Sequence, residues 1–509
     1  MERESKSGCT VEERTGAVGR LMNQQDLERY LWGAATALRG TIDAGDYKQF
    51  IFPLLFFKRI CDVYEEEFQK ALEESDGDKD YAAFEENHRF QIPKGAHWKN
   101  VREVTTNVGV ALQKAMRAIE KANPDTLYGI FGDANWSNKE RLSDETLINL
   151  IEHFSKHTLN IKNVPDDQLG NGYEYLIKQF ADDSGHTAAE FYTNRTVVKL
   201  MTLIMDPKSG ESVYDPTCGS GGLLLNCALH LKELGKEYRT LRLYGQEINL
   251  ITSSIARMNM FLHGIEEFQI VRGDTLEQPA FLENDELRTF NIILANPPYS
   301  IKSWNRTKFE SDPYGRNIWG TPPQGCADYA FQQHIHKSLD PKNGRSITLW
   351  PHGILFRDSE ESMRRKMIEQ DIVECVIGLG PNLFYNSSMV SCLLVTSKNK
   401  PLDRKGKILF IQAVDEVRKE KTMSYLDDKH IKKILNAYTN FKSISEFSKV
   451  EKIETILKDK NARLSVELFV KDSSVSANQN SFANIVGDWE NSTEQLSQSM
   501  NELFKVIGK

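Results

Sequence analysis

The sequence predicts an α/β fold in which a mostly parallel sheet follows an all-helical domain and precedes a helical tail. Three observations support this prediction. Between residues 166 and 415, short apolar runs alternate with helical patterns, which is typical of a parallel sheet covered by helices on both faces. Residues 23–165 show apolar residues at helical spacing, and residues 416–509 become charged and helical in pattern. Residues 1–22 are polar and are expected to be disordered.

The composition limits the kind of protein this can be. A chain of 509 residues is too long for one typical core, so two or three domains are expected. The net charge of −8 predicts weak DNA binding by this chain alone, because DNA affinity depends largely on basic residues that neutralise phosphates. Seven cysteines without a C-x-x-C pair argue against a structural metal site or a disulfide framework, and no metal is expected.

Neither a membrane span nor a secretion signal is expected. The longest apolar run lies near Phe50 to Phe57 and is far too short to cross a bilayer. The first residues, Met1 to Glu4, contain no apolar signal core. A cytoplasmic location is therefore the expectation.

The helical patterns of the first domain can be assigned in order. The first helix is indicated by Leu27, Leu31, Ala34, Ala35, Leu38 and Ile42, which recur three or four positions apart. A second helix is expected over residues 46–69, and its apolar first half predicts burial. The charged stretch 73–87 is expected to be a loop. Further helices are expected at 111–121 and 143–157.

Eight strands and the helices between them are predicted for the second domain. The strands are Ser212–Asp215, Arg242–Glu247, Ile270–Gly273, Phe290–Ala295, Ser346–Trp350, Ile372–Gly378, Val390–Thr396 and Lys407–Ala413. Helices are expected at 221–234, 251–263 and 329–339. The amphipathic segment 482–507 fits equally docking on a partner helix and packing within the chain, and we assign partner docking to residues 416–509.

Polar residues stand where four of these strands end. Asp215 ends the first strand, Glu247 ends the second, Asp274 follows the third and Asn296 follows the fourth. The intervals of 32, 27 and 22 residues are each close to one strand–helix–strand step of roughly thirty residues. In a doubly wound sheet the carboxyl ends of the strands form the ligand-binding edge. We therefore expect these four side chains to line one site.

A glycine-rich loop, Asp215-Pro216-Thr217-Cys218-Gly219-Ser220-Gly221-Gly222, follows the first strand. Its glycines let the backbone turn tightly and approach a ligand closely. The loop is neither G-x-G-x-x-G nor a P-loop, so a cofactor with adenosine but no phosphates fits better, which is the shape of S-adenosylmethionine. Glu247 is expected to bind ribose hydroxyls, and Asp274 an adenine amine. The predicted cofactor residues of the loop are Asp215, Cys218, Gly219, Ser220 and Gly221.

The tetrapeptide Asn296-Pro297-Pro298-Tyr299 suits the binding of a planar amino group. An exocyclic amine is a poor nucleophile, because its lone pair is delocalised into the ring. The Asn296 side-chain oxygen and the Pro297 carbonyl would accept its two hydrogens, while consecutive prolines stiffen the loop. Tyr299 would stack on the base. A base inside a duplex is out of reach, so it would have to be flipped out.

These motifs resemble the amino-methyltransferases of DNA, and more narrowly the methyltransferase (M) subunit of type I restriction-modification systems. The resemblance runs from about Asp26 to Ala413 and implies a Rossmann-like S-adenosylmethionine-dependent methyltransferase domain. Residues 189–195 resemble the family's segment that contacts the methionine end of the cofactor. The residues so implied are Ala189, Glu190, Phe191, Tyr192, Thr193 and Asn194. Asn194 stands where the family usually has proline, and we expect it to hydrogen-bond locally through its side chain.

The resemblance also implies a target and partners. The cofactor segment precedes the glycine loop and the Asn-Pro-Pro-Tyr motif, an order that in this family accompanies the N6 atom of adenine. A specificity (S) subunit would read the DNA sequence, and two M subunits with one S subunit would form the methyltransferase. A restriction (R) subunit would complete the complex and cut DNA.

Two other functions remain open from the sequence. Asn-Pro-Pro-Tyr also suits methylation of a protein glutamine amide or of an RNA base, although the long helical N-terminal domain weighs against both. A non-catalytic scaffold that binds the cofactor only to stabilise a DNA-binding complex is the third possibility. The intact Asn296 and Tyr299 argue against a scaffold.

Overall fold

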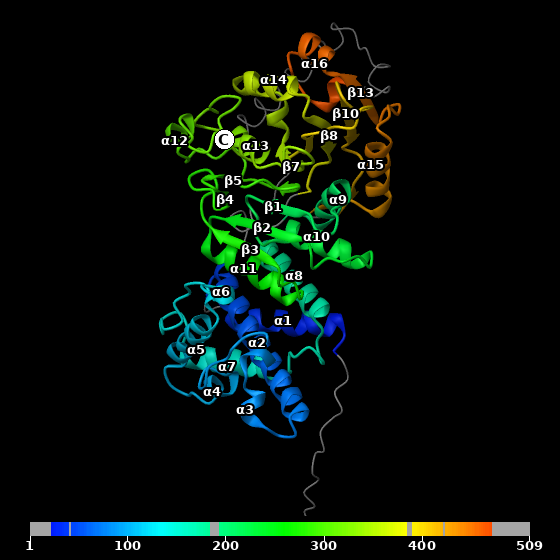
Figure 1. Cartoon of the computed structure of the whole chain (residues 1–509). Helices are drawn as coiled ribbons and strands as arrows, with labels where there is room; N and C mark the ends of the chain where they lie inside the picture. Colours follow the sequence, from blue (N-terminus) through cyan, green and yellow to red (C-terminus); the bar gives the residue numbers. More distant parts are fainter. Residues whose placement is uncertain (1–21, 40–41, 184–192, 384–388, 421–422, 471–509) are drawn as a thin grey trace, which may run out of the picture.

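The structure is a computed structural model, and it describes residues 22–39, 42–183, 193–383, 389–420 and 423–470. A helical region forms one end of the molecule and a sheet covered by helices forms the other (Figure 1). The predicted order of a helical domain followed by an α/β domain is confirmed. The segment 482–507, expected to dock on a partner, lies outside the described residues. Within the described ranges, no helix combines the length and apolar character needed to cross a membrane.

The N-terminal region is built around one long helix, α2 (Lys48–Glu74), whose first half is buried. Its helices are α1 (Gln24–Leu38), α2 (Lys48–Glu74), α3 (Lys79–Ala82), α4 (Trp98–Arg102), α5 (Val108–Ala122), α6 (Pro124–Leu127), α7 (Asp144–Ser155) and α8 (Asp166–Asp183). The apolar first half of α2 is fully buried, as its composition predicts. The stretch 73–87 is not only loop: α2 continues to Glu74, and Asp78 caps the short helix α3 by accepting hydrogen bonds from two backbone N–H groups.

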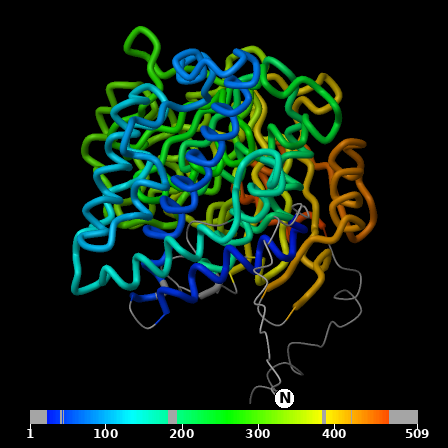
Figure 2. Tube along the Cα trace, turned by 90° about the horizontal axis from the view of Figure 1, so that it is seen from below, coloured from blue at the N-terminus to red at the C-terminus, as the bar shows by residue number. Residues whose placement is uncertain are grey.

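Helix α8 joins the two regions. It packs along α1 on one side and against α11 (Leu250–Leu262) on the other, and the view from below shows α1 and α8 side by side (Figure 2). Two glycines make this approach possible. A Cβ atom on Gly170 would lie 2.4 Å from the His263 ring, and one on Gly172 would lie 2.8 Å from Leu31. The Tyr173 hydroxyl donates a hydrogen bond to the Ile255 carbonyl (3.1 Å), so α8 fixes the helical region against the sheet region.

The second region contains a nine-stranded sheet in the order β13-β10-β8-β9-β7-β6-β1-β2-β3. The strands are β1 (Ser212–Asp215), β2 (Arg242–Glu247), β3 (Phe268–Arg272), β6 (Ile292–Ala295), β7 (Arg345–Pro351), β8 (Val373–Leu379), β9 (Ser391–Ser397), β10 (Lys407–Ala413) and β13 (Ser448–Lys452). All eight predicted strands are present. Neighbours pair in parallel except around β9 and β13, which are antiparallel to their partners. Two short hairpins, β4–β5 (Leu282–Glu283 and Glu286–Leu287) and β11–β12 (Arg418–Lys419 and Ser424–Tyr425), stand apart.

Both faces of the sheet are covered, because alternate residues of each strand point to opposite sides. In β10, Leu409 and Ile411 pack with the helices of one face, whereas Ile408 and Phe410 pack with those of the other. The first face carries α9 (Arg195–Met205), α10 (Gly222–Glu233), α11 and α15 (Asp428–Asn440). The second carries α13 (Asp328–Lys337), α14 (Glu361–Glu369) and α16 (Ile453–Asp459), whereas the short helix α12 (Arg306–Glu310) lies in the loop before α13.

The sheet extends past the boundary predicted at residue 415. Helices α15 and α16 agree with the predicted helical C-terminal region, but β13 lies between them and pairs with β10. The order of the strands reverses between β1 and β6, because the chain runs outward through β2 and β3 and then returns to β6. In doubly wound sheets such a reversal opens a crevice at the carboxyl ends of the two strands.

Candidate active site

The four polar residues predicted at strand ends lie along one edge of the sheet. Strands β1, β2, β3 and β6 are parallel neighbours, and their registers pair Asp215 with Gly245 and Glu247 with Arg272. Asn296 directly follows β6, next to β1. The carboxyl ends therefore meet at the reversal of strand order, as the spacing of the residues predicts.

The glycine loop after β1 has the tight geometry that its composition predicts. Gly219 and Gly221 adopt left-handed conformations with φ of 53° and 79°, which residues with a side chain adopt at a cost. A Cβ atom on Gly221 would also lie 3.0 Å from the Met260 side chain. The Cys218 side chain lies over Gly245, and burial raises the pKa of its thiol, so this cysteine packs as a small apolar group.

Glu247 connects the end of β2 to the glycine loop. One of its carboxylate oxygens accepts a hydrogen bond from the Gly219 N–H (3.0 Å) and the other from the Asn249 N–H (2.9 Å). Burial raises the pKa of Glu247. The Ile248 N–H is a third backbone donor to this carboxylate. A carboxylate has about four acceptor sites, so at least one is left for a further donor. Glu247 thus holds the loop in shape and can still accept a hydroxyl group.

One pocket joins the glycine loop to Asn296. Among the predicted residues it is lined by Thr193, Asp215, Cys218, Gly219, Ser220 and Asn296. Glu247 and Asp274 lie beyond this lining on the same sheet edge. Asp274 is half-buried, and one carboxylate oxygen accepts hydrogen bonds from the N–H groups of Leu276 and Glu277.

Two buried polar atoms at this pocket lack a hydrogen-bond partner among the described residues: Asp215 Oδ2 and Thr217 Oγ1. Burial, together with the nearby Glu247 carboxylate, raises the pKa of Asp215 to about 8. Burying unsatisfied polar atoms is costly, so such atoms commonly mark a ligand site. The pocket fits a polar, cationic ligand, which would satisfy both atoms.

The Asn296 side chain is held at both ends. Its Nδ2 group donates to Thr193 Oγ1 (3.1 Å), and its Oδ1 accepts from the Tyr299 hydroxyl (2.7 Å). The Tyr299 ring is half-buried and lies 6.5 Å from the Trp350 ring at an angle of 46°. Burial raises the pKa of Tyr299, so its hydroxyl remains a donor. Neither hydrogen bond of Asn296 is evident from the sequence. The bond to Thr193 joins residues far apart in the chain, and the bond from Tyr299 depends on the shape of the loop after β6.

The segment before α9 is described from Thr193 onward, so Ala189, Glu190, Phe191 and Tyr192 lie outside the described residues. Asn194 forms the local hydrogen bond predicted for it. Its side chain accepts from the Thr196 N–H (2.9 Å) as the N-cap of α9, and its Nδ2 donates to the Ser424 carbonyl (2.9 Å). The side chain that replaces the usual proline thus caps a helix and connects it to β12.

Seven residues that line the pocket are not among the predicted site residues, and three of the seven have charged or polar side chains outside the glycine loop. Glu174 of α8 and Arg195 of α9 form an ion pair of 2.7 Å at the pocket. Asn226 lies one helical turn after Gly222 and also lines the pocket. The hint in the sequence is proximity: Arg195 ends the segment 189–195 and Asn226 lies in the predicted helix 221–234. Glu174 lies in the distant helix α8 and has no such hint.

Comparison with known proteins agrees with this geometry. A sequence model of the N-6 DNA methylase family matches residues 164–478, which is more than half of the chain. This chain belongs to that family. A second model, for the HsdM N-terminal domain, matches residues 27–154.

Relatives narrow the family to methylase subunits of type I restriction enzymes. The chain is 30% identical over 505 residues to the type I restriction enzyme MpnII methylase subunit of Mycoplasma pneumoniae, covering 89% of this chain and 90% of that protein. The crystal structure of a type I restriction-modification methyltransferase subunit from Streptococcus thermophilus matches with a TM-score of 0.76 and 30% identity, over 88% of this chain and all of that one. A chain from a study of complex assembly and conformational transition of the type I system shares the fold, with a TM-score of 0.67, 20% identity and coverage of 96% and 99% of the two chains. This chain is therefore an enzyme of the N-6 DNA methylase family.

Proposed function

We propose that this chain is the modification subunit of a type I restriction-modification complex and methylates N6 of an adenine flipped out of DNA. The observation that supports this most is the pocket lined both by the glycine loop and by Asn296. A cofactor on the loop and an amine on Asn296 would share one space. Placement in preorganised hydrogen bonds supplies the catalysis in such a site.

The pocket residues fit S-adenosylmethionine, which supplies an activated methyl group on a cationic sulfur when bound. The unpartnered Asp215 Oδ2 would accept a hydrogen bond from the cofactor's ammonium group. The Thr217 hydroxyl, which also lacks a partner, would form a second hydrogen bond with the cofactor. Glu247 keeps an acceptor site for the ribose. Ile248, which is 60% exposed next to Glu247, would cover one face of the adenine ring. Asp274 and residues 189–192 are proposed to complete the cofactor site.

On the other side of the pocket, Asn296 prepares the target amine. Thr193 accepts from the amide nitrogen and so fixes the orientation of the amide. Tyr299 occupies one acceptor site of that oxygen and leaves the second for the amine. Together with the Pro297 carbonyl, this oxygen would hold both amine hydrogens and draw the nitrogen toward a tetrahedral shape. The nitrogen lone pair would then be available for methyl transfer.

We also propose the partners that a type I modification subunit needs. An acidic chain of net charge −8 binds DNA weakly by itself. An S subunit would therefore supply sequence recognition and much of the DNA contact, with two M subunits to one S subunit. An R subunit would join for cleavage, and the complex would act in the cytoplasm.

The proposal is tested by Asn296→Ala in the full chain assembled with its S subunit. We expect methylation to fall by about 100- to 1,000-fold, as for the loss of a preorganised polar group in a transition state, while cofactor affinity is unchanged. Asn440→Ala, at the exposed end of α15, is the matched control and should be fully active. An active Asn296→Ala variant would refute the assignment of Asn296.

A further inference from the structure

The residue that follows the Asn-Pro-Pro-Tyr motif has an unfavourable backbone conformation. Ser300 has φ of 50°, in the left-handed region. Residues with a side chain rarely adopt this conformation, and it persists only where the surroundings enforce it. Here it turns the chain directly after Tyr299, whose hydroxyl reaches back to Asn296 Oδ1. The geometry of the proposed amine site therefore depends on whatever holds Ser300.

Asp328 holds Ser300 in this conformation. Its Oδ1 accepts a hydrogen bond of 2.8 Å from the Ser300 N–H. Asp328 is fully buried at the first position of α13, 28 residues further along the chain. A hydrogen bond to a buried carboxylate is among the stronger ones in proteins. This contact joins the loop after β6 to a helix on the second face of the sheet.

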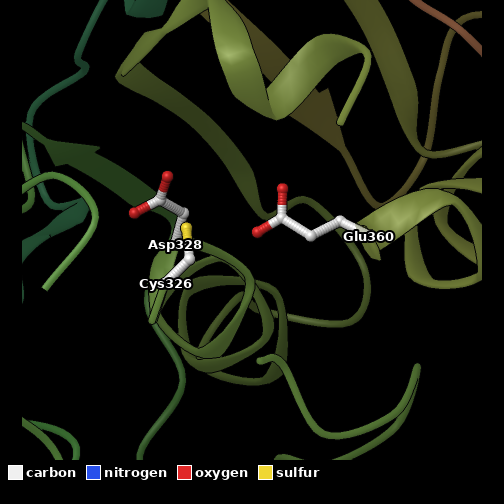
Figure 3. A group of neighbouring side chains, drawn as sticks. All are labelled: Cys326, Asp328 and Glu360. Atoms are coloured by element: carbon white, nitrogen blue, oxygen red, sulfur yellow. The ribbon is translucent and has the colours of Figure 1, made fainter. Parts of the chain in front are cut away.

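Asp328 is fixed in turn by a buried ionic network. Arg357 donates from Nη2 to Asp328 Oδ2 and from Nε to Glu360 Oε2 (2.7 Å), and Glu360 is fully buried. Figure 3 shows the Glu360 side chain pointing toward Cys326 and Asp328, which come from a different segment of the chain. Arg357 Nη1 also lies 3.5 Å from Ser300 Oγ. The network therefore contacts Ser300 at both its backbone and its side chain.

Cys326, Asp328 and Glu360 have possible metal-ligand atoms within 4.8 Å of one another. The guanidinium of Arg357 already bridges the two carboxylates, so a cation is present at this position. The two carboxylates are therefore held together by Arg357. Gly353 leaves room for this arginine, since a Cβ atom there would lie 2.8 Å from Nη1.

We propose that Asp328, fixed by Arg357 and Glu360, is a positioning residue that keeps Ser300 left-handed and so places the Tyr299 hydroxyl on Asn296. This inference rests on the proposed role of Asn296 in amine binding. Asp328 lies outside the pocket, yet the rate of methyl transfer would depend on it. The glycine loop and the affinity for the cofactor would not depend on Asp328.

The test combines Asp328→Ala with a second change at Ser300 in the full chain assembled with its S subunit. Asp328→Ala should lower kcat for methylation by about 10- to 100-fold, which corresponds to the loss of a hydrogen bond to a charged group. The dissociation constant for S-adenosylmethionine should not change. Ser300→Gly removes the need for the anchor, because glycine adopts positive φ freely. It should restore kcat of the Asp328→Ala variant by about fivefold or more.

A matched control separates this effect from a general gain in folding. Glu446 is an exposed residue with φ of 61° in the loop before β13, and Glu446→Gly should not restore kcat of Asp328→Ala. Full activity of Asp328→Ala, or equal rescue by the two glycine substitutions, would overturn the positioning role. Normal activity of Asn296→Ala would instead overturn the proposed function on which the inference rests.

Discussion

The buried carboxyl group of Asp215 makes a sharp prediction about pH. Its side chain is 1% exposed, one oxygen accepts from the Thr217 N–H, and the other has no partner among the described residues. Burial raises its pKa from 3.8 to about 8, so the group is protonated in the folded ligand-free chain near neutral pH. In the unfolded chain it ionises near pH 4.

The sign follows from proton linkage. The folded state binds a proton that the unfolded state has already released, so Asp215 lowers the free energy of unfolding as pH rises from about 4 to about 8. At about 1.4 kcal/mol per pH unit, the loss reaches up to about 6 kcal/mol. The contribution is complete below the unfolded pKa and is lost as pH passes through the folded pKa. Asp215→Asn keeps the acceptor for Thr217 but cannot ionise, so it should remove this loss.

The assay is the difference in free energy of unfolding between Asp215→Asn and the unmodified chain, measured by denaturant at several pH values without cofactor. Titrating groups that do not interact with Asp215 cancel in this difference, whereas the nearby Glu247 carboxylate is coupled to it. The variant should gain relative stability steadily between about pH 4 and 8. A difference that stays constant over this range would show that Asp215 ionises normally in the folded chain and would contradict the raised pKa.

Cofactor binding gives the same prediction a second readout. An ionised Asp215 can pair with a cationic ligand, whereas the protonated form cannot. Affinity for S-adenosylmethionine should therefore rise as pH increases toward about 8, the pKa of Asp215 in the ligand-free chain, and Asp215→Asn should weaken binding and flatten this dependence. Identical pH profiles for the two proteins would contradict a contact between Asp215 and the cofactor's cation.

Three substitutions test the rest of the site. Tyr299→Phe should lower kcat by about tenfold, because Asn296 loses a hydrogen bond. Cofactor affinity, measured by equilibrium binding, should not change, and an unchanged kcat would contradict the contact between Tyr299 and Asn296. Thr193→Val removes the acceptor for the Asn296 amide and should lower the rate of single-turnover methylation by about five- to tenfold. A normal rate would show that Thr193 does not orient the Asn296 amide. Gly221→Ala should cost about 1–2 kcal/mol of stability and weaken cofactor binding in calorimetry. Gly77→Ala, which is strained by its φ of 94° but has open space around it, should cost stability alone, and equal cofactor binding in both variants would contradict the role of the loop.

The sheet could be predicted from the sequence because its strands are buried on both faces. Strands such as β8 and β10 are nearly continuous apolar runs, a pattern that stands out between helical segments. Strand β13 was not predicted, because its sequence Ser-Lys-Val-Glu-Lys pairs with β10 on one side only and carries the charges typical of an edge strand. The direction of β9 could not be predicted either, since an apolar run does not encode parallel or antiparallel pairing.

The site was predictable where it depends on the ends of neighbouring strands. Asp215, Glu247, Asp274 and Asn296 each end or follow a predicted strand, at successive intervals near one strand–helix–strand step, and parallel strands bring such ends together. The contacts that orient these groups were not predictable. The hydrogen bond from Asn296 to Thr193 spans 103 residues, and its formation depends on how α9 packs on the sheet.

The most direct test of the proposed function is methyl transfer from labelled S-adenosylmethionine to unmodified DNA, with this chain alone and with its S subunit. We expect label at N6 of adenine that requires the S subunit. Equal labelling by the chain alone would contradict the partner assignment and would mean that this chain recognises DNA itself. Bound cofactor with no label in DNA, even with the S subunit present, would contradict the proposed methylation of adenine.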